Sequence, residues 1–214
     1  MNLNKKNKKV AVVGSGPAGL GCADQLSRLG YDVTVFERDD RPGGLLMYGV
    51  PNIKLPKELL MEKIADLEAR GVKFVLNWEL NAPEDFEKLQ KDFAAVVLCV
   101  GGRKAKGLPG IQVDNKQIYH AKDFLTEVTK DMLNGTELAN LKDKDVVIIG
   151  GGDTGVDCAA IALAQGARTV HQLEMQECDA TANSARDNLC NIVIGDYTIS
   201  YGTMMKRLLR DEEG

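Results

Sequence analysis

Two glycine-rich turns are the parts of this 214-residue sequence whose residue types and spacing point to chemistry. Each turn follows an apolar run typical of a strand and precedes a segment typical of a helix, and the two lie about 135 residues apart. A GxGxxG turn in that context directs backbone N–H groups and the positive end of a helix toward a pyrophosphate. Two such turns predict two bound dinucleotides, and therefore electron transfer between cofactors. The first turn comprises Gly14, Ser15, Gly16, Pro17, Ala18 and Gly19, and the second comprises Gly150, Gly151, Gly152, Asp153, Thr154 and Gly155.

An acidic residue supports the first of these sites. Strands are expected at residues 9–13, 32–36, 72–76 and 93–100, with helices at 17–29 and 56–70. Glu37 directly follows the second strand, 23 positions after Gly14. Because a carboxylate about 20 residues after the first glycine accepts the ribose hydroxyls of a dinucleotide, we expect Glu37 to bind an adenosine ribose.

The second turn has an acidic residue in the same relation to it. Glu174 lies 24 residues after Gly150 and follows an expected strand at 168–173. A carboxylate at this position would accept the 2′-OH of NAD and repel the 2′-phosphate of NADP. Arg168 and Arg186 are the cations available if NADP is the donor, so the sequence leaves the choice between NADH and NADPH open.

After this strand the pattern is weaker. Residues 191–194 and 197–201 are expected to form a short hairpin, and residues 203–213 a helix. With the strand expected at 145–149, they would give an open sheet of few strands. A partner or a second copy of the chain would cover the unpaired edges of such a sheet.

Composition and charge exclude several classes of function. The net charge of −4, with 27 basic and 31 acidic residues, gives no reason to expect nucleic acid or an anionic membrane as a partner. No apolar run approaches the ~18 residues of a membrane span, so we expect a cytoplasmic protein. The five cysteines are scattered without a CxxC pair, which predicts neither an iron–sulfur centre nor another metal site.

A loop motif makes the interpretation more specific. Gly43 and Gly44 allow a close approach to a ligand, and Leu45, Met47 and Tyr48 offer apolar surface for a flat ring. The stretch from Gly43 to Leu55 resembles the small subunit of glutamate synthase. So do the Ala-Lys-Asp-Phe-Leu segment at 121–125 and the second glycine turn, in the same order and spacing, and the likeness covers residues 9 to about 176. The flavin half of dihydropyrimidine dehydrogenase is a more distant relative.

The resemblance implies an α/β fold with two Rossmann-like dinucleotide-binding units of the two-dinucleotide flavoprotein type, incomplete at the C-terminus. It implies a basic linker at 1–8, the N-terminal part of an FAD-binding domain at 9–102, a connecting segment at 103–144 and part of an NAD(P)-binding domain at 145–214. NADPH or NADH would pass a hydride to FAD. The family then passes electrons through iron–sulfur clusters to a large subunit that makes glutamate, so that subunit or an iron–sulfur acceptor is the expected partner.

The same resemblance assigns residues to each cofactor. The second glycine turn and Glu174 would hold the nicotinamide nucleotide. Lys54 matches a position at which relatives carry a cation that contacts FAD, although a solvated loop lysine explains it equally well. No side chain is assigned as a catalytic acid or base, because hydride transfer between two rings needs none. The remaining expected contacts of FAD are the first glycine turn, Glu37, Arg38, Gly43, Gly44, Leu45, Leu80 and Gly101.

Three departures from the family pattern leave an alternative open. The chain has no cysteine-rich domain before the first turn, and residues 175–180 lack the tryptophan- and proline-rich stretch of the family. It also reaches Gly214 without the strand and glycine turn by which the family returns to the flavin domain. A nucleotide-binding remnant without catalytic activity is therefore the alternative to an oxidoreductase module.

Overall fold

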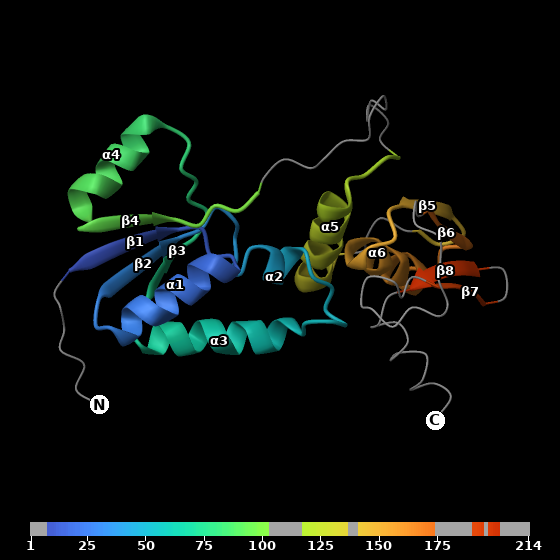
Figure 1. Cartoon of the computed structure of the whole chain (residues 1–214), viewed down its shortest axis with the longest axis horizontal. Coiled ribbons are helices and arrows are strands. Elements are labelled where there is room, and N and C mark those ends of the chain that lie inside the picture. The colour runs from blue at the N-terminus through green and yellow to red at the C-terminus, as the bar shows by residue number, and fades with distance from the viewer. Residues whose placement is uncertain (1–7, 103–116, 137–140, 174–189, 195–196, 202–214) are drawn as a thin grey trace. The chain divides into compact units, whose positions relative to one another are not determined.

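The computed structural model describes residues 8–102, 117–136 and 141–173, and the backbone of two further strands at 190–194 and 197–201 (Figure 1). The chain divides into two compact units, residues 1–112 and 113–214. Both units are α/β in architecture, and each is described by itself. The expected helix at 203–213 lies outside the described residues.

The first unit contains a four-stranded parallel sheet in the order β3-β2-β1-β4. This order is that of a Rossmann unit, in which successive strands are joined by helices that cover both faces of the sheet. The strands are β1 (Lys9–Val13), β2 (Asp32–Phe36), β3 (Lys73–Val75) and β4 (Ala95–Leu98). The helices are α1 (Pro17–Arg28), α2 (Leu45–Tyr48), α3 (Lys57–Ala69) and α4 (Pro83–Asp92).

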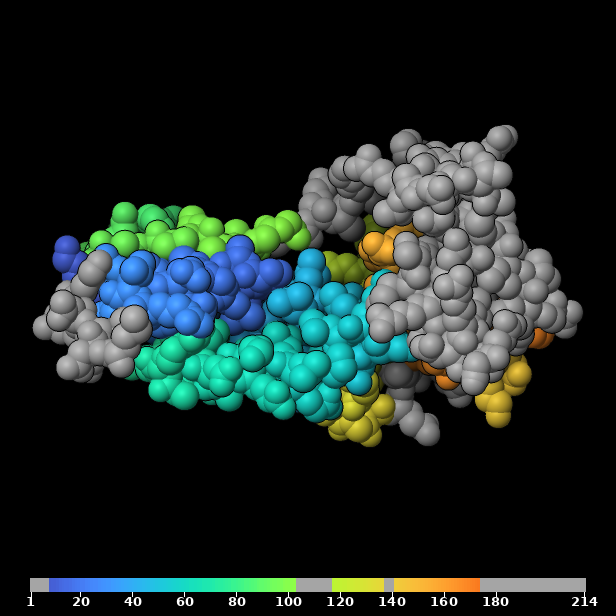
Figure 2. Space-filling view, turned by 60° about the horizontal axis from the view of Figure 1, so that its bottom comes forward, coloured from blue at the N-terminus to red at the C-terminus, as the bar shows by residue number. Residues whose placement is uncertain are grey.

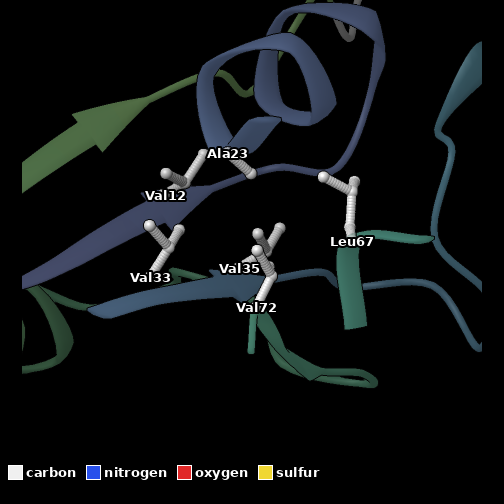
Figure 3. Close-up of a cluster of buried hydrophobic side chains, with 6 residues drawn as sticks. All are labelled: Val12, Ala23, Val33, Val35, Leu67 and Val72. Carbon is white, nitrogen blue, oxygen red and sulfur yellow. The ribbon is translucent and has the colours of Figure 1, made fainter. Parts of the chain in front are cut away.

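Alternating side chains of the central strands build two cores, one on each face of the sheet. On one face, Val12, Val33 and Val35 point toward α1 and α3 and meet Ala23, Leu67 and Val72 (Figure 3). On the other face, Ala11 and Val13 pack with Leu89 of α4. The helices α1 and α3 are in contact and form one continuous surface of this unit (Figure 2). These buried valines fix the carboxyl end of β1, where the first glycine turn begins.

The second unit repeats the strand–turn–helix–strand order. Strand β5 (Asp145–Ile149) leads into α6 (Asp153–Ala164), and α6 leads into β6 (Thr169–Leu173), which pairs in parallel with β5. Ala159, Ala162, Ala167 and Val170 form the core between α6 and the sheet. Helix α5 (Ala121–Asn134) precedes this unit's sheet in the chain and contacts α6.

The expected hairpin after β6 is confirmed. Strands β7 (Cys190–Ile194) and β8 (Tyr197–Tyr201) pair antiparallel, and β8 also pairs with β6 to give the order β5-β6-β8-β7. The α/β fold class predicted from the sequence is confirmed as well. No helix in the described ranges is long and apolar enough to span a bilayer.

Helices α2, α4 and α5 had no counterpart among the expected elements. Helix α4 begins with Pro83, and Asp85 in its first turn accepts hydrogen bonds from the backbone N–H groups of Asn81 and Ala82, at 3.1 and 3.0 Å. Proline in the first turn and an acidic residue three positions after the cap are ordinary signals of a helix start. Helix α5 ends at Gly135 in a left-handed conformation, which is an equally ordinary stop signal.

Candidate dinucleotide-binding sites

The three glycines of the first turn have three different steric roles. A Cβ on Gly14 would lie 2.3 Å from the carbonyl oxygen of Cys99, and a Cβ on Gly19 would lie 1.9 Å from the carbonyl oxygen of Gly14. Glycine at these two positions therefore lets the turn and α1 pack closely against the end of β4. A Cβ on Gly16 would meet no atom within 4 Å. The one glycine with free space in front of it is the position at which a pyrophosphate approaches the backbone in Rossmann units.

The start of α1 is arranged to receive an anion. Gly16 is the N-cap of the helix and provides no side-chain cap, and Pro17 occupies the first turn. The first N–H groups of a helix have no intrahelical acceptor, and they lie at the positive end of the helix dipole. Pro17 and Ala18 are exposed at this end, as a ligand contact requires. These features fit a bound pyrophosphate.

A buried hydrogen-bond network joins the glycine turn to the acidic residue after β2. Glu37 is 5% exposed, and its Oε2 accepts hydrogen bonds from the backbone N–H of Ser15 at 2.9 Å and from the Ser15 hydroxyl at 2.5 Å. Its Oε1 accepts from the backbone N–H of Asp39 at 2.9 Å. The orientation of the carboxylate is therefore fixed by the turn itself. Carboxylate oxygens accept two hydrogen bonds each, so Oε1 keeps acceptor capacity for a ribose hydroxyl.

The same serine reaches the double-glycine loop. The backbone N–H of Gly43 donates to Ser15 Oγ at 2.9 Å. Gly44 has a φ of 54° and lies so near the turn that a Cβ on it would be 2.9 Å from the Cα of Gly16. A side chain at Gly44 would be strained by the backbone and blocked by the turn. The loop and the glycine turn thus form one surface, and no local sequence pattern indicated that Ser15 joins them.

A polar cluster holds the other side of this loop. The hydroxyl of Tyr48 in α2 donates to Asp40, and Arg41 donates to Asp40 at 2.7 Å and to the Tyr48 hydroxyl at 3.4 Å. Burial, followed by the hydrogen bond to the Asp40 carboxylate, raises the pKa of Tyr48 to about 12. Tyr48 therefore stays neutral, and it anchors α2 to the segment after β2.

The other predicted FAD residues of the first unit have varied surroundings. Leu45 is 52% exposed at the start of α2, and Lys54 is half-buried in the loop that follows. Arg38 is exposed, and its Nε lies 3.8 Å from Oδ2 of Asp39. Leu80 packs on the α4 face of the sheet. Gly101 follows β4, and these contacts with FAD stay predictions.

The second and third glycines of the second turn have the same steric roles as those of the first turn, whereas a Cβ on its first glycine, Gly150, would meet no atom within 4 Å. A Cβ on Gly152 would meet no atom within 4 Å, whereas a Cβ on Gly155 would lie 2.1 Å from the carbonyl oxygen of Gly150. Gly152 is the N-cap of α6, without a side-chain cap, and Asp153 begins the helix. Asp153 and Thr154 are exposed, and Gly151 is buried. The helix start and the open central glycine fit a second pyrophosphate.

Each turn is tied to the strand that precedes its acidic residue. The backbone N–H of Gly14 donates to the carbonyl of Phe36 at 2.8 Å, and the N–H of Gly150 donates to the carbonyl of Leu173 at 2.8 Å. Phe36 directly precedes Glu37, and Leu173 directly precedes Glu174. Glu174 itself lies outside the described residues, so its contact with a ribose stays a prediction.

A glutamine that sequence analysis did not single out supports the second turn. Gln172 of β6 is 8% exposed, and its Nε2 donates to the carbonyl oxygen of Gly150 at 2.7 Å. A Cβ on Gly155 would lie 2.5 Å from that nitrogen. Gln172 therefore fills the space beneath the turn and fixes the path of its backbone. Its place two residues before an expected ribose-binding acid was the only available signal.

The structure corrects the suggestion that Arg168 serves NADP. Arg168 precedes β6, and its side chain donates to the carboxylate of Asp145, the first residue of β5. In a parallel pair both strands start at the same end of the sheet, and the glycine turn lies at the other end. Five strand residues span about 16 Å, which puts Arg168 out of reach of a ribose beside Gly150. Arg186, the alternative cation, lies outside the described residues.

Together these features define a class of protein. Each unit has a parallel strand pair, a GxGxxG turn with an open central glycine, and a helix whose first N–H groups lack side-chain caps. A chain with two such units is an α/β protein built to bind two dinucleotides.

The sequence profile of the pyridine nucleotide-disulphide oxidoreductase family matches residues 8–185, and the chain belongs to this family. It is 48% identical over 172 residues to the glutamate synthase (NADPH) small chain of Bacillus subtilis strain 168, and this match covers 78% of this chain and 35% of that protein. It is 41% identical over 177 residues to glutamate synthase (NADH) of Schizosaccharomyces pombe, and this match covers 80% of this chain and 8% of that protein. The resemblance to the glutamate synthase small subunit is therefore confirmed. The chain spans about a third of the length of the first relative.

Solved structures agree with the fold. FprA from Mycobacterium tuberculosis in complex with NADPH matches 77% of this chain and 42% of its own, with a TM-score of 0.61 and 22% identity. A 2-naphthoyl-CoA reductase complex matches 77% of this chain and 23% of its own, with a TM-score of 0.58 and 32% identity.

Proposed function

We propose that this chain binds FAD in its first unit and NADPH or NADH in its second unit, and that it passes a hydride from the nicotinamide to the flavin. The single observation that carries the proposal is the repeated turn, in which Gly16 and Gly152 each face open space at the start of a helix. The flavin reading of the first unit is supported by the loop at 43–51, which contacts the first turn through Gly44. The family membership and the glutamate synthase relatives support the pairing of these two cofactors.

In this proposal the residues of the chain bind the two cofactors and orient them. The N–H groups at the starts of α1 and α6 would hold the two pyrophosphates, and Glu37 would hold the adenosine ribose of FAD through Oε1. FAD, when bound, supplies a ring that accepts two electrons and a proton as hydride. Residues 9–102 would form the FAD-binding part, and residues 145–214 part of the NAD(P)-binding domain.

The proposal extends to partner and location by analogy with the relatives. As in a glutamate synthase small chain, the electrons would leave for a large subunit or another iron–sulfur acceptor, and the protein would work in the cytoplasm, alone or as a homo-oligomer. Arg168 lies at the far end of the sheet, so the carboxylate of Glu174 would repel the 2′-phosphate of NADPH and disfavour its binding, unless Arg186 compensates for the negative charge. The choice between NADH and NADPH stays open on this basis.

FAD binding by the purified chain tests the proposal. We expect the protein to bind FAD, visible as the flavin absorbance bands, with an affinity that Gly16→Ala lowers. Gly21→Ala is the matched control, because a Cβ on Gly21, an exposed residue of α1, also meets no atom within 4 Å. A folded wild-type chain that binds no added FAD would contradict the proposal, and a loss of binding in both variants would remove Gly16 from the site.

A further inference from the structure

A lysine in the first turn of α3 is buried in an unusual way. Lys57 is 2% exposed, and its ammonium group donates to the carbonyl oxygens of Leu46 at 2.9 Å and Val50 at 2.6 Å. Its backbone N–H donates to Oδ1 of Asn52 at 2.9 Å, which fixes the start of the helix. Burial lowers the pKa of Lys57. Both acceptors of the ammonium group belong to the double-glycine loop.

Packing alone does not explain an ammonium group at this place. Burial of a charge is unfavourable unless the charge is well hydrogen-bonded, and a methionine would fill a similar volume without that penalty. The ammonium group instead meets the carbonyl of Leu46 in α2 and the carbonyl of Val50 two residues after this helix. The last four carbonyls of a helix have no N–H donor within the helix, and α2 has only four residues. The loop's carbonyls are thus drawn onto α3 by a single side chain.

The loop is held at both of its ends. At the near end Gly43 donates to Ser15, beside the glycine turn, and at the far end Leu46 and Val50 accept from Lys57. Between these anchors, Leu45 is exposed. Only the near anchor touches the residues expected to bind FAD.

We propose that Lys57 is a positioning residue, which clamps the loop at 43–51 onto α3 and so holds Gly44 and Leu45 in place for the flavin nucleotide. The inference rests on the proposed function, because that function gives the loop its ligand. Two hydrogen bonds from a charged donor hold the loop, and transfer of about one such bond's free energy to ligand binding would weaken FAD binding by about 10- to 100-fold when Lys57 is replaced. The fold of the β1–α1–β2 core would remain, because the side chain of Lys57 donates to the loop.

Lys57→Met tests the clamp, since it removes the ammonium group and keeps the length of the side chain. Lys63→Met is the matched control on the same helix, where the lysine side chain is 78% exposed. Amide hydrogen exchange without FAD should accelerate in residues 43–51 of Lys57→Met and stay unchanged in β1. The dissociation constant of FAD should rise about 10- to 100-fold in Lys57→Met and not in Lys63→Met. In Lys57→Ala, added n-propylammonium should restore part of the affinity, and n-propanol should not.

Two results would overturn the clamp. One is a Lys57→Met variant in which the amides of residues 43–51 exchange at the wild-type rate and FAD binds with the wild-type affinity. The other is equal acceleration in β1 and in the loop, in both Lys57→Met and the milder Lys57→Gln, which would make Lys57 a general stabilising residue. A wild-type chain that binds no FAD would instead refute the proposed function, and the exchange experiment would still decide the clamp.

Discussion

Alanine substitutions at Gly16 and Gly19 should separate ligand binding from folding. At Gly19 an added Cβ would lie 1.9 Å from the carbonyl oxygen of Gly14, a contact about 1 Å shorter than any that real Cβ atoms make. Relief of that contact requires α1 to move away from the turn. Overpacking of this kind costs about 1–3 kcal/mol of the free energy of unfolding, and more where backbone must move.

At Gly16 the same methyl group would meet no atom of the protein within 4 Å, and the φ of −64° suits alanine. The free energy of unfolding of Gly16→Ala should therefore lie within about 0.5 kcal/mol of the wild type. The methyl group would stand where the pyrophosphate approaches. Loss of one hydrogen bond to a charged phosphate costs about 1.5–3 kcal/mol, a fall in FAD affinity of about 10- to 100-fold.

Urea unfolding of the FAD-free proteins by circular dichroism and titration with FAD measure the two effects. We expect Gly19→Ala to lose stability and Gly16→Ala to lose affinity, with Gly21→Ala close to the wild type in both. The reasoning is refuted if Gly16→Ala is destabilised as much as Gly19→Ala, or if it binds FAD as tightly as the wild type.

Three further predictions concern the second turn, a buried tyrosine and a corrected arginine. Gly152→Ala should weaken NAD(P)H binding in a titration and leave FAD binding unchanged; equal affinity for NAD(P)H would remove the turn from that site. The raised pKa of Tyr48, about 12 against an ordinary value of 10, means that the native state holds this proton more tightly than the unfolded state. The contribution of the neutral Tyr48 side chain to stability is therefore complete below about pH 10 and is lost as the pH rises toward 12. Measured by urea unfolding, Tyr48→Phe should lose less stability than the wild type over this range. A parallel decline in both proteins would contradict the raised pKa of Tyr48, to which burial and then the Asp40 hydrogen bond contribute. Arg168→Gln should leave the ratio of NADH to NADPH affinities unchanged, because Arg168 is paired with Asp145; a tenfold change in that ratio would place it in the site after all.

The elements that sequence analysis predicted well are those with strong local patterns. Apolar runs bounded by glycines predicted β1, α1, β2, β5 and β6 within a residue or so of their observed bounds. The same local patterns placed the two turns. The missed helices α4 and α5 are amphipathic at helical spacing, so their apolar periodicity, the proline start of α4 and the glycine stop of α5 were all available signals.

The tertiary contacts of the site had no comparable local signal. Lys57 follows a proline and precedes a glutamate, which is typical of an exposed first helical turn, yet its side chain is buried against the loop. The Ser15 hydroxyl reaches residues 22 and 28 positions away. The error at Arg168 was avoidable, because a residue before a parallel strand lies at the end of the sheet opposite to the glycine turn.

Anaerobic reduction of the FAD-loaded chain tests the central claim most directly. NADPH or NADH is mixed with the protein, and the oxidised flavin bands are followed over time, with Gly152→Ala as the variant impaired in the second site. Transfer of a hydride predicts loss of those bands with one nicotinamide oxidised per FAD, and slower loss in Gly152→Ala or with a donor deuterated at the transferred position. Flavin that stays oxidised in the presence of saturating NADPH and NADH would contradict the account.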